Sequence, residues 1–207
     1  MANLKKKEGS IQQTIKDKQA QAKKFQKEID KIIAEEIRKA NERAAKDATV
    51  TKPSSDNSVK MALTPVEKAL STSFASNKGK LPWPVERGVV SSSYGKHPSP
   101  LSERVMVTNN GIDIATTENA KARCVFKGEV VTVVKPSASN IGVIIRHGDF
   151  FTVYSQLDEV YVNRGDKVDT KQDIGRVHTD RSEGKTEIHF ELRQGIDCLN
   201  PTIWLSK

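Results

Sequence analysis

Residues 121–154, KARCVFKGEVVTVVKPSASNIGVIIRHGDFFTVY, decide the fold class. Short runs of β-branched and aromatic residues alternate in this stretch with the turn dipeptides Lys127-Gly128 and Gly148-Asp149. Further β-rich runs stand at 89–92, 161–162, 174–177 and 187–193, again separated by glycine-containing turns. Closely spaced strands with almost no helical periodicity predict a mainly β, antiparallel domain over residues 81–207.

Residues 1–48 have a different pattern, which is typical of one long amphipathic helix. Apolar residues recur from Ile11 to Ala44 at steps of mostly three, four or seven, and good helix formers fill the positions between them. Because a lone amphipathic helix has nothing within itself to pack against, a coiled coil is predicted. Lys18 and Lys39 interrupt the heptad register, so a long surface helix that lies on the β domain is the alternative.

Residues 49–80 are predicted to connect these two parts. The stretch 49–58, TVTKPSSDNS, has the composition of a linker. Thr64-Pro65-Val66-Glu67 is a capping box with proline at the first helical position, which predicts a short helix at about 64–75. This helix could lie over a groove of the β domain and restrain it, or it could be a passive connector at the sheet edge.

Composition and charge exclude several classes of protein. The 207 residues are 36% hydrophobic and 29% charged, too apolar for disorder throughout and too polar for a membrane protein. Two cysteines cannot form a disulfide scaffold or a four-cysteine zinc site. Residues 1–60 hold 15 Lys and Arg against 9 Asp and Glu, so most of the net charge of +8 lies there. No basic stripe interleaved with aromatic residues follows, and nucleic acid is not an expected partner.

The sequence predicts different roles for two of the four histidines. His147 stands at a hairpin turn and is expected to be structural. His189 lies in Glu187-Ile188-His189-Phe190-Glu191, and on a strand the two glutamates and the histidine share one face. Such a face can be a metal or acid–base site, or it can be the solvated face of a sheet.

A series of short motifs runs in order through the β domain. The pieces are Asn110-Gly111-Ile112-Asp113, 142–148 (GVIIRHG), 154–157 (YSQL), 165–168 (GDKV), 188–193 (IHFELR) and 200–205 (NPTIWL). The series resembles the LytM or lysostaphin-like zinc metallopeptidases, which cut peptidoglycan cross-bridges. This resemblance implies a small β-sheet fold with an open groove over the metal. A long helix, a linker and then this domain also resemble the EnvC group of murein hydrolase activators.

Three departures from the family pattern decide the predicted function. Asn109 stands where the family has a metal-binding histidine, and Gln156 and Glu187 stand at its two catalytic histidines, whereas the ligand positions Asp113 and His189 are kept. An amide oxygen is a poor replacement for imidazole at zinc, and a glutamine cannot exchange protons. We therefore expect no bound metal or other cofactor and no catalysis.

The resemblance to the EnvC group then implies a non-catalytic domain that binds and activates a peptidoglycan amidase in cell-wall remodelling and cell division. The residues expected to line its partner-binding groove are Tyr94, Asn109, Asp113, Tyr154, Gln156, Glu187, His189 and Arg193. Peptidoglycan itself, and an upstream division complex that contacts the coiled coil, are further candidate partners. The same resemblance implies a periplasmic or cell-envelope location. No signal peptide begins the sequence, so we expect that the targeting segment is absent from it.

Two other functions remain open on the sequence. Glu187 could serve as a general base or as a third metal ligand, which would make the chain a zinc metalloendopeptidase with an altered site. Alternatively, the chain could be a passive wall-binding or scaffolding protein in which the basic helix makes the binding contacts.

Overall fold

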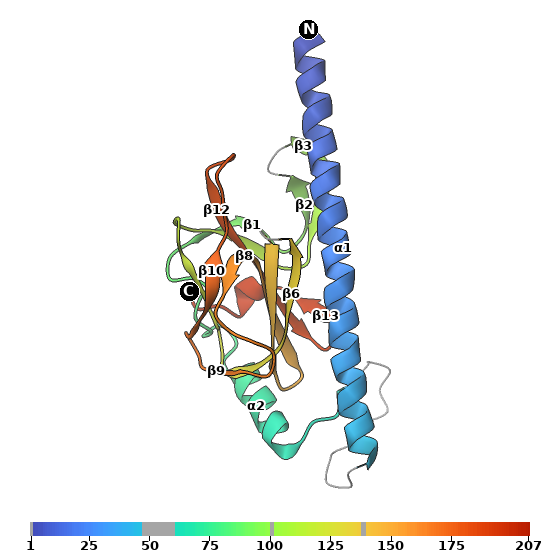
Figure 1. The fold of residues 1–207 in the computed structure, drawn as a ribbon, viewed down its shortest axis with the longest axis vertical. Helices are drawn as coiled ribbons and strands as arrows, with labels where there is room; N and C mark the ends of the chain where they lie inside the picture. Colours follow the sequence, from blue (N-terminus) through green and yellow to red (C-terminus); the bar gives the residue numbers. More distant parts are fainter. Residues whose placement is uncertain (1, 47–60, 100–101, 138–139) are drawn as a thin grey trace.

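A computed structural model describes residues 2–46, 61–99, 102–137 and 140–207 (Figure 1). The predicted linker at 49–58 lies outside these residues. The helices are α1 (Ala2–Lys46), α2 (Pro65–Ser76) and the 3₁₀ turn η1 (Pro201–Ile203). No helix among the described residues is long and apolar enough to cross a membrane.

The domain is mainly β, as predicted, and its ladders are antiparallel. The strands are β1 (Val89–Ser92), β2 (Gly95–Ser99), β3 (Ser102–Asn109), β4 (Ile112–Ala115), β5 (Lys121–Arg123), β6 (Gly128–Ser137), β7 (Asn140–His147), β8 (Phe150–Val160), β9 (Lys167–Val168), β10 (Asp173–Val177), β11 (Thr179–Asp180), β12 (Lys185–Gln194) and β13 (Asp197–Leu199). The main path of the sheet is β1-β4-β12-β8-β7-β6-β9, while β2 and β3 form a separate hairpin.

The two faces of this sheet bury different sets of side chains. On β12, Ile188, Phe190 and Leu192 point into the principal core, which β5, β10 and α2 help to close. The alternating residues His189, Glu191 and Arg193 point to the opposite face. The sheet therefore separates an apolar core from the face that carries the polar residues of β12.

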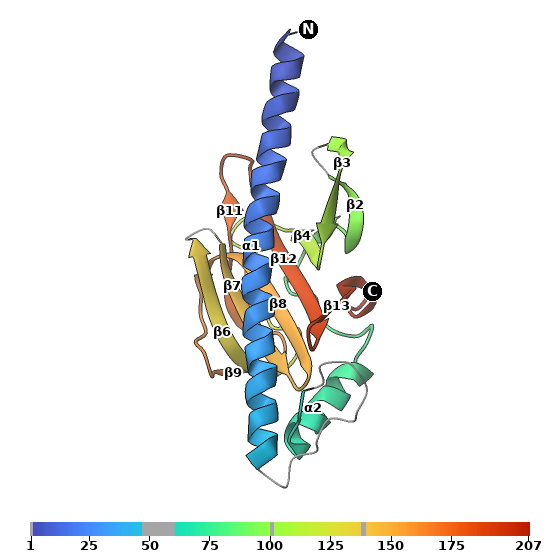
Figure 2. The same ribbon diagram turned by 90° about the vertical axis from the view of Figure 1, so that its right-hand side faces the viewer.

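Helix α1 covers this second face. Phe25, Ile29, Ile33, Ile37 and Ala40 form one stripe of the helix. The stripe packs on side chains from β6, β7 and β8, namely Val131, Val134, Ile144, Phe151 and Val153. Figure 2 shows the helix crossing the sheet, and its N-terminal part extends beyond it. A coiled coil is thus not confirmed. The structure shows the alternative, a long helix that lies on the β domain, because the sheet itself supplies the apolar surface that the stripe needs.

Helix α2 is a connector anchored in the principal core. It begins with the predicted capping box of Thr64 and Glu67. Phe74 is fully buried and stacks on Phe150 and His147, with ring centroids 4.7 and 5.0 Å apart. Ser71 also donates a hydrogen bond to Asp149 in the β7–β8 turn. The position of α2 agrees with the predicted connector and not with a helix that covers a groove. Helix α1, not α2, lies over the face that carries His189.

Candidate functional site

The polar site is built where three strands meet in register. On β12, His189 pairs with Asp113 of β4 on one side and with Ser155 of β8 on the other. The β4 strand begins just after Asn109, which ends β3. Residues that are far apart in the sequence are brought together here because antiparallel neighbours place paired side chains on one face.

A continuous chain of charged side chains starts at Asp113 and ends on helix α1. Asp113 Oδ1 lies 2.6 Å from His189 Nδ1, and His189 Nε2 lies 3.0 Å from Glu191 Oε1. The other oxygen of Glu191 accepts from Arg193 Nε at 2.9 Å. Arg193 Nη1 then donates to Asp30 Oδ1 of α1 at 2.7 Å. Negative and positive groups alternate along the whole chain, so each buried charge has an opposite neighbour.

Burial and pairing act against each other on these groups. Burial lowers the pKa of His189, but hydrogen bonds and charges from Asp113 and Glu191 outweigh it and raise that pKa to about 10. Burial raises the pKa of Glu191, but His189 and Arg193 hold it below its ordinary value. The imidazole is therefore protonated at neutral pH, and both of its nitrogens act as donors.

Asn109 occupies the other side of Asp113. Its Nδ2 donates to Asp113 Oδ2 and to Ser92 Oγ, each at 3.1 Å, while its Oδ1 accepts from the backbone N–H of Gly111 at 2.9 Å. Ser92 Oγ is also 3.0 Å from His97 Nε2 in the β2–β3 hairpin. The amide oxygen thus faces the backbone, and the amide nitrogen faces the carboxylate.

This domain corresponds to a known family. The model of peptidase family M23 matches residues 107–201, which hold Asn109, Asp113 and His189. We refer to this matched segment, residues 107–201, as the M23 domain. The resemblance seen in the sequence is thereby confirmed.

Relatives of the M23 domain include proteins named for different roles. The full chain is 23% identical to the murein hydrolase activator EnvC of Escherichia coli and covers 46% of it. It is 31% identical to stage II sporulation protein Q of Bacillus subtilis over 51% of this chain and 41% of that protein. A zinc-containing peptidase from Vibrio cholerae is similar in structure, with a TM-score of 0.51 and 27% identity over 60% of this chain and 40% of that one. The chain spans less than half the length of these curated relatives, and the matches support a peptidoglycan-related role.

The donor atoms in the M23 domain do not fit the family's zinc site. A catalytic zinc needs three protein ligands with free lone pairs and an open position for water. Here both nitrogens of His189 face carboxylates, and Asn109 turns its amide nitrogen toward Asp113. Among the described residues, no group of three or more His, Cys, Asp and Glu side chains is arranged to hold a metal ion.

The structure brings together only part of the predicted groove. Asn109, Asp113 and His189 form one cluster. Glu187 lies on β12, two residues before His189 and opposite Ala115 of β4. Arg193 lies on the same face but is fully buried under α1.

Tyr154 is placed differently from the prediction, whereas the contacts of Tyr94 and Gln156 neither confirm nor exclude a place in the groove. Tyr154 does not line the groove, because it points into the principal core, where its hydroxyl accepts from the N–H of Val125. Tyr94 packs against the core and donates to the carbonyl of Cys198 at 2.9 Å. Gln156 has a positive φ of 65°, and its backbone bonds to Asn140 and His178.

Two members of the charged chain were not among the predicted groove residues. Glu191 shares the strand face of His189, and its spacing could have indicated it. Asp30 carries no such signal, because its pairing with Arg193 depends on how α1 docks.

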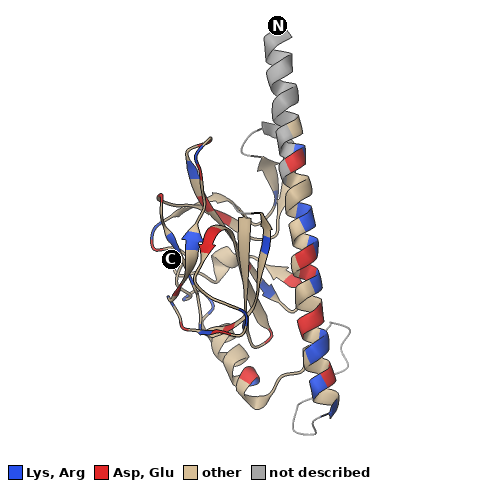
Figure 3. Ribbon diagram, in the orientation of Figure 1, with Lys and Arg blue, Asp and Glu red and all other residues tan. Residues whose placement is uncertain are grey.

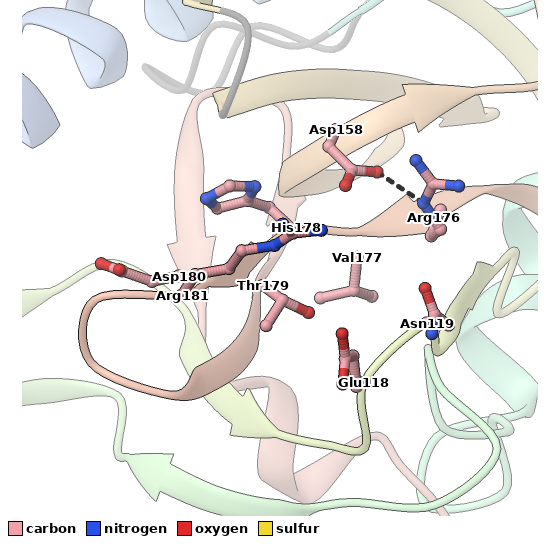
Figure 4. Close-up of a pocket in the computed structure, with 9 residues that line it drawn as sticks. All are labelled: Glu118, Asn119, Asp158, Arg176, Val177, His178, Thr179, Asp180 and Arg181. Atoms are coloured by element: carbon pink, nitrogen blue, oxygen red, sulfur yellow. Dashed lines mark hydrogen bonds and ion pairs between the residues drawn. The ribbon is translucent and has the colours of Figure 1, made fainter.

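A separate pocket of about 470 Å³ lies at β10 and β11 (Figure 4). In this pocket Arg176 Nε donates to Asp158 Oδ1 at 2.9 Å. The residues that line it are Glu118, Asn119, Asp158, Arg176, Val177, His178, Thr179, Asp180 and Arg181. None of them is a predicted groove residue or a member of the charged chain, although the N–H of His178 donates to the carbonyl of Gln156 at 2.8 Å.

Proposed function

We propose that this chain is a non-catalytic M23-domain protein that binds and activates a peptidoglycan amidase in cell-wall remodelling and cell division. The observation that carries the proposal is the hydrogen bonding of Asn109, Asp113 and His189. In each of these side chains, the nitrogen or oxygen atoms that could bind a metal already form hydrogen bonds with protein groups. We propose accordingly that the chain holds no zinc and has no hydrolytic activity of its own.

The sequence at the catalytic positions supports the same proposal. Gln156 cannot take or give a proton, and without a metal no bound water reaches a pKa near 7. The likeness to the EnvC activator extends over the whole chain, including α1 and α2. A periplasmic or cell-envelope location and a partner amidase follow from that likeness as parts of the proposal.

A zinc endopeptidase with an altered site is the second candidate. Its support is the structural likeness to the Vibrio cholerae peptidase, together with Glu187, a half-buried carboxylate on the strand of His189. Asn109, Gln156 and Glu187 all stand where the family has histidines. Glu187 would have to serve as third metal ligand and as general base at once, which makes this candidate the weaker one.

Activation of an amidase tests the proposal directly. Dye-labelled sacculi are incubated with an amidase from the same organism, with this chain, and with both. The proposal predicts release by the mixture well above release by the amidase alone. Equal release with and without the chain, at concentrations where the two proteins bind, would refute activation.

The control uses the separate pocket at β10 and β11, which holds none of the predicted groove residues. An Arg181→Ala change in the loop after β11 alters an exposed residue of that pocket and should leave activation unchanged. Sacculus pulldown of the same chain separates activation from a passive wall-binding role, which predicts retention on sacculi without any effect on the amidase.

A further inference from the structure

Arg193 is an unusual residue to find beneath an amphipathic helix. Its side chain is 0% exposed, and it is one of the largest fully buried side chains among the described residues. Among the described residues of the sheet, its charged partner is Glu191, which is 1% exposed and whose second oxygen is already bound by His189. The Nη1 atom therefore depends on a partner from the helix side, and Asp30 supplies it at 2.7 Å.

Two other directional contacts of α1 lie outside the sheet: Glu36 pairs with Arg164 at 3.7 Å, and Asn41 accepts from the N–H of Ala62 at 2.7 Å. The remaining contacts of α1 with the sheet are apolar and carry little directional information. Phe25, Ile29, Ile33 and Ile37 recur every four residues and pack on aliphatic and aromatic side chains of the sheet. A helix displaced by one turn would present a closely similar stripe. The Asp30–Arg193 pair is satisfied in one register only, because a guanidinium accepts a carboxylate in a fixed geometry.

We propose that Arg193 is the specificity-determining residue of this sheet face, which accepts an amphipathic helix only if the helix places a carboxylate directly after its central apolar residue. In α1 the pattern is Phe25, Ile29-Asp30, Ile33 and Ile37. The inference rests on the proposed function in one respect, since the partner is taken to be a helix of the activated enzyme that carries the same pattern in place of α1.

The physical reason is the cost of an unpaired buried guanidinium group. A helix with a neutral residue at this position would cover Arg193 Nη1 without supplying the opposite charge that compensates the loss of water. A hydrogen bond to a charged group corresponds to roughly a 10- to 100-fold change in affinity. Loss of the carboxylate should therefore weaken docking by about tenfold or more.

The test measures binding of α1 peptides to the full chain. Ile29→Ala and Ile33→Ala are combined in the chain to weaken its own α1, and a fluorescent peptide of residues 19–46 is added. We expect the peptide to bind, and its Asp30→Asn form to bind about tenfold or more weakly. The matched control is the Glu28→Gln peptide, which loses the same charge from an exposed position and should bind as the unaltered peptide does.

Three results would overturn the inference. They are equal binding of the unaltered and Asp30→Asn peptides, equal weakening by Asp30→Asn and Glu28→Gln, and no binding of any peptide. Hydrogen exchange on the otherwise unaltered chain gives a second reading: Asp30→Asn should lower protection of residues 25–44, and Glu28→Gln should not. Neither of these two experiments contains an amidase. If the peptides bind selectively but the chain fails to activate an amidase in the sacculus assay, only the proposed function is refuted.

Discussion

Asn109 shows how one side chain changes the chemistry of its neighbours. An imidazole at this position would offer a lone pair to a cation beside Asp113, whereas the amide offers two N–H donors. Those donors go to Asp113 and Ser92, and the carboxylate is held by a hydrogen bond in place of a metal. His189, with carboxylates at both nitrogens, is stabilised as a cation. The local structure thus favours a proton where the family has zinc.

Restoring the imidazole should partly reverse this arrangement. We expect Asn109→His to bind zinc measurably, because it completes the family's set of three ligands with Asp113 and His189. Metal analysis after dialysis against zinc should give close to one zinc per chain for the variant and far less for the unaltered protein. Equal zinc contents in the two proteins would contradict the role given to Asn109.

His147 gives a prediction about pH that is separate from the site. Its Nδ1 donates to the carbonyl of Lys127 and its Nε2 accepts from Thr152, each at 2.8 Å, as expected for a structural histidine. Burial lowers the pKa of His147 to about 4, against 6.5 in the unfolded chain. The unfolded state therefore binds the extra proton first as the pH falls.

This stabilising contribution is complete above pH 6.5 and is lost as the pH falls toward 4. It amounts to about 3 kcal/mol at most. Urea unfolding of the unaltered chain and of His147→Asn at several pH values between 4 and 7 isolates it. The variant should be less stable at pH 7 and should lose less stability on acidification. Parallel pH profiles for the two proteins would rule this contribution out.

At the scale of elements, helix α1 behaves as part of the domain. The sequence periodicity was sufficient to predict the helix and the need for an apolar partner. It could not identify that partner, because a stripe of Ile and Phe packs equally well on another helix or on a sheet. The capping box at Thr64 predicted the start of α2 closely, since capping depends on neighbouring residues alone. The contact between Asp30 and Arg193 depends on the docking of distant elements, which no local pattern encodes.

A single truncation on α1 distinguishes packing on the sheet from packing in a coiled coil. Ile33 is fully buried, so Ile33→Ala should lower the free energy of unfolding of the whole chain by about 2–4 kcal/mol. Ile203, which is 53% exposed, provides the matched control, and Ile203→Ala should cost less than about 0.5 kcal/mol. If Ile33→Ala leaves the unfolding of the β domain unchanged while it alters the oligomeric state, α1 pairs with another helix instead.

At the scale of the whole molecule, the covered face and the exposed surface have different characters. Charges of both signs recur along α1 (Figure 3), whereas its buried stripe is apolar. Asp30 and Glu36 are the α1 carboxylates whose ion pairs with the β domain, to Arg193 and Arg164, the described residues show. The helix lies on the same face as the M23 residues Asp113 and His189. A partner that reaches Arg193 on this face must therefore contact α1 or take its place.

The central claim is that the M23 domain of this chain does not hydrolyse peptidoglycan. The most direct measurement is the release of soluble fragments from purified sacculi by the full chain alone, with added zinc and with a chelator. The account predicts no release above buffer under either condition. Release that depends on the amount of chain, increases with zinc and disappears with the chelator would contradict it.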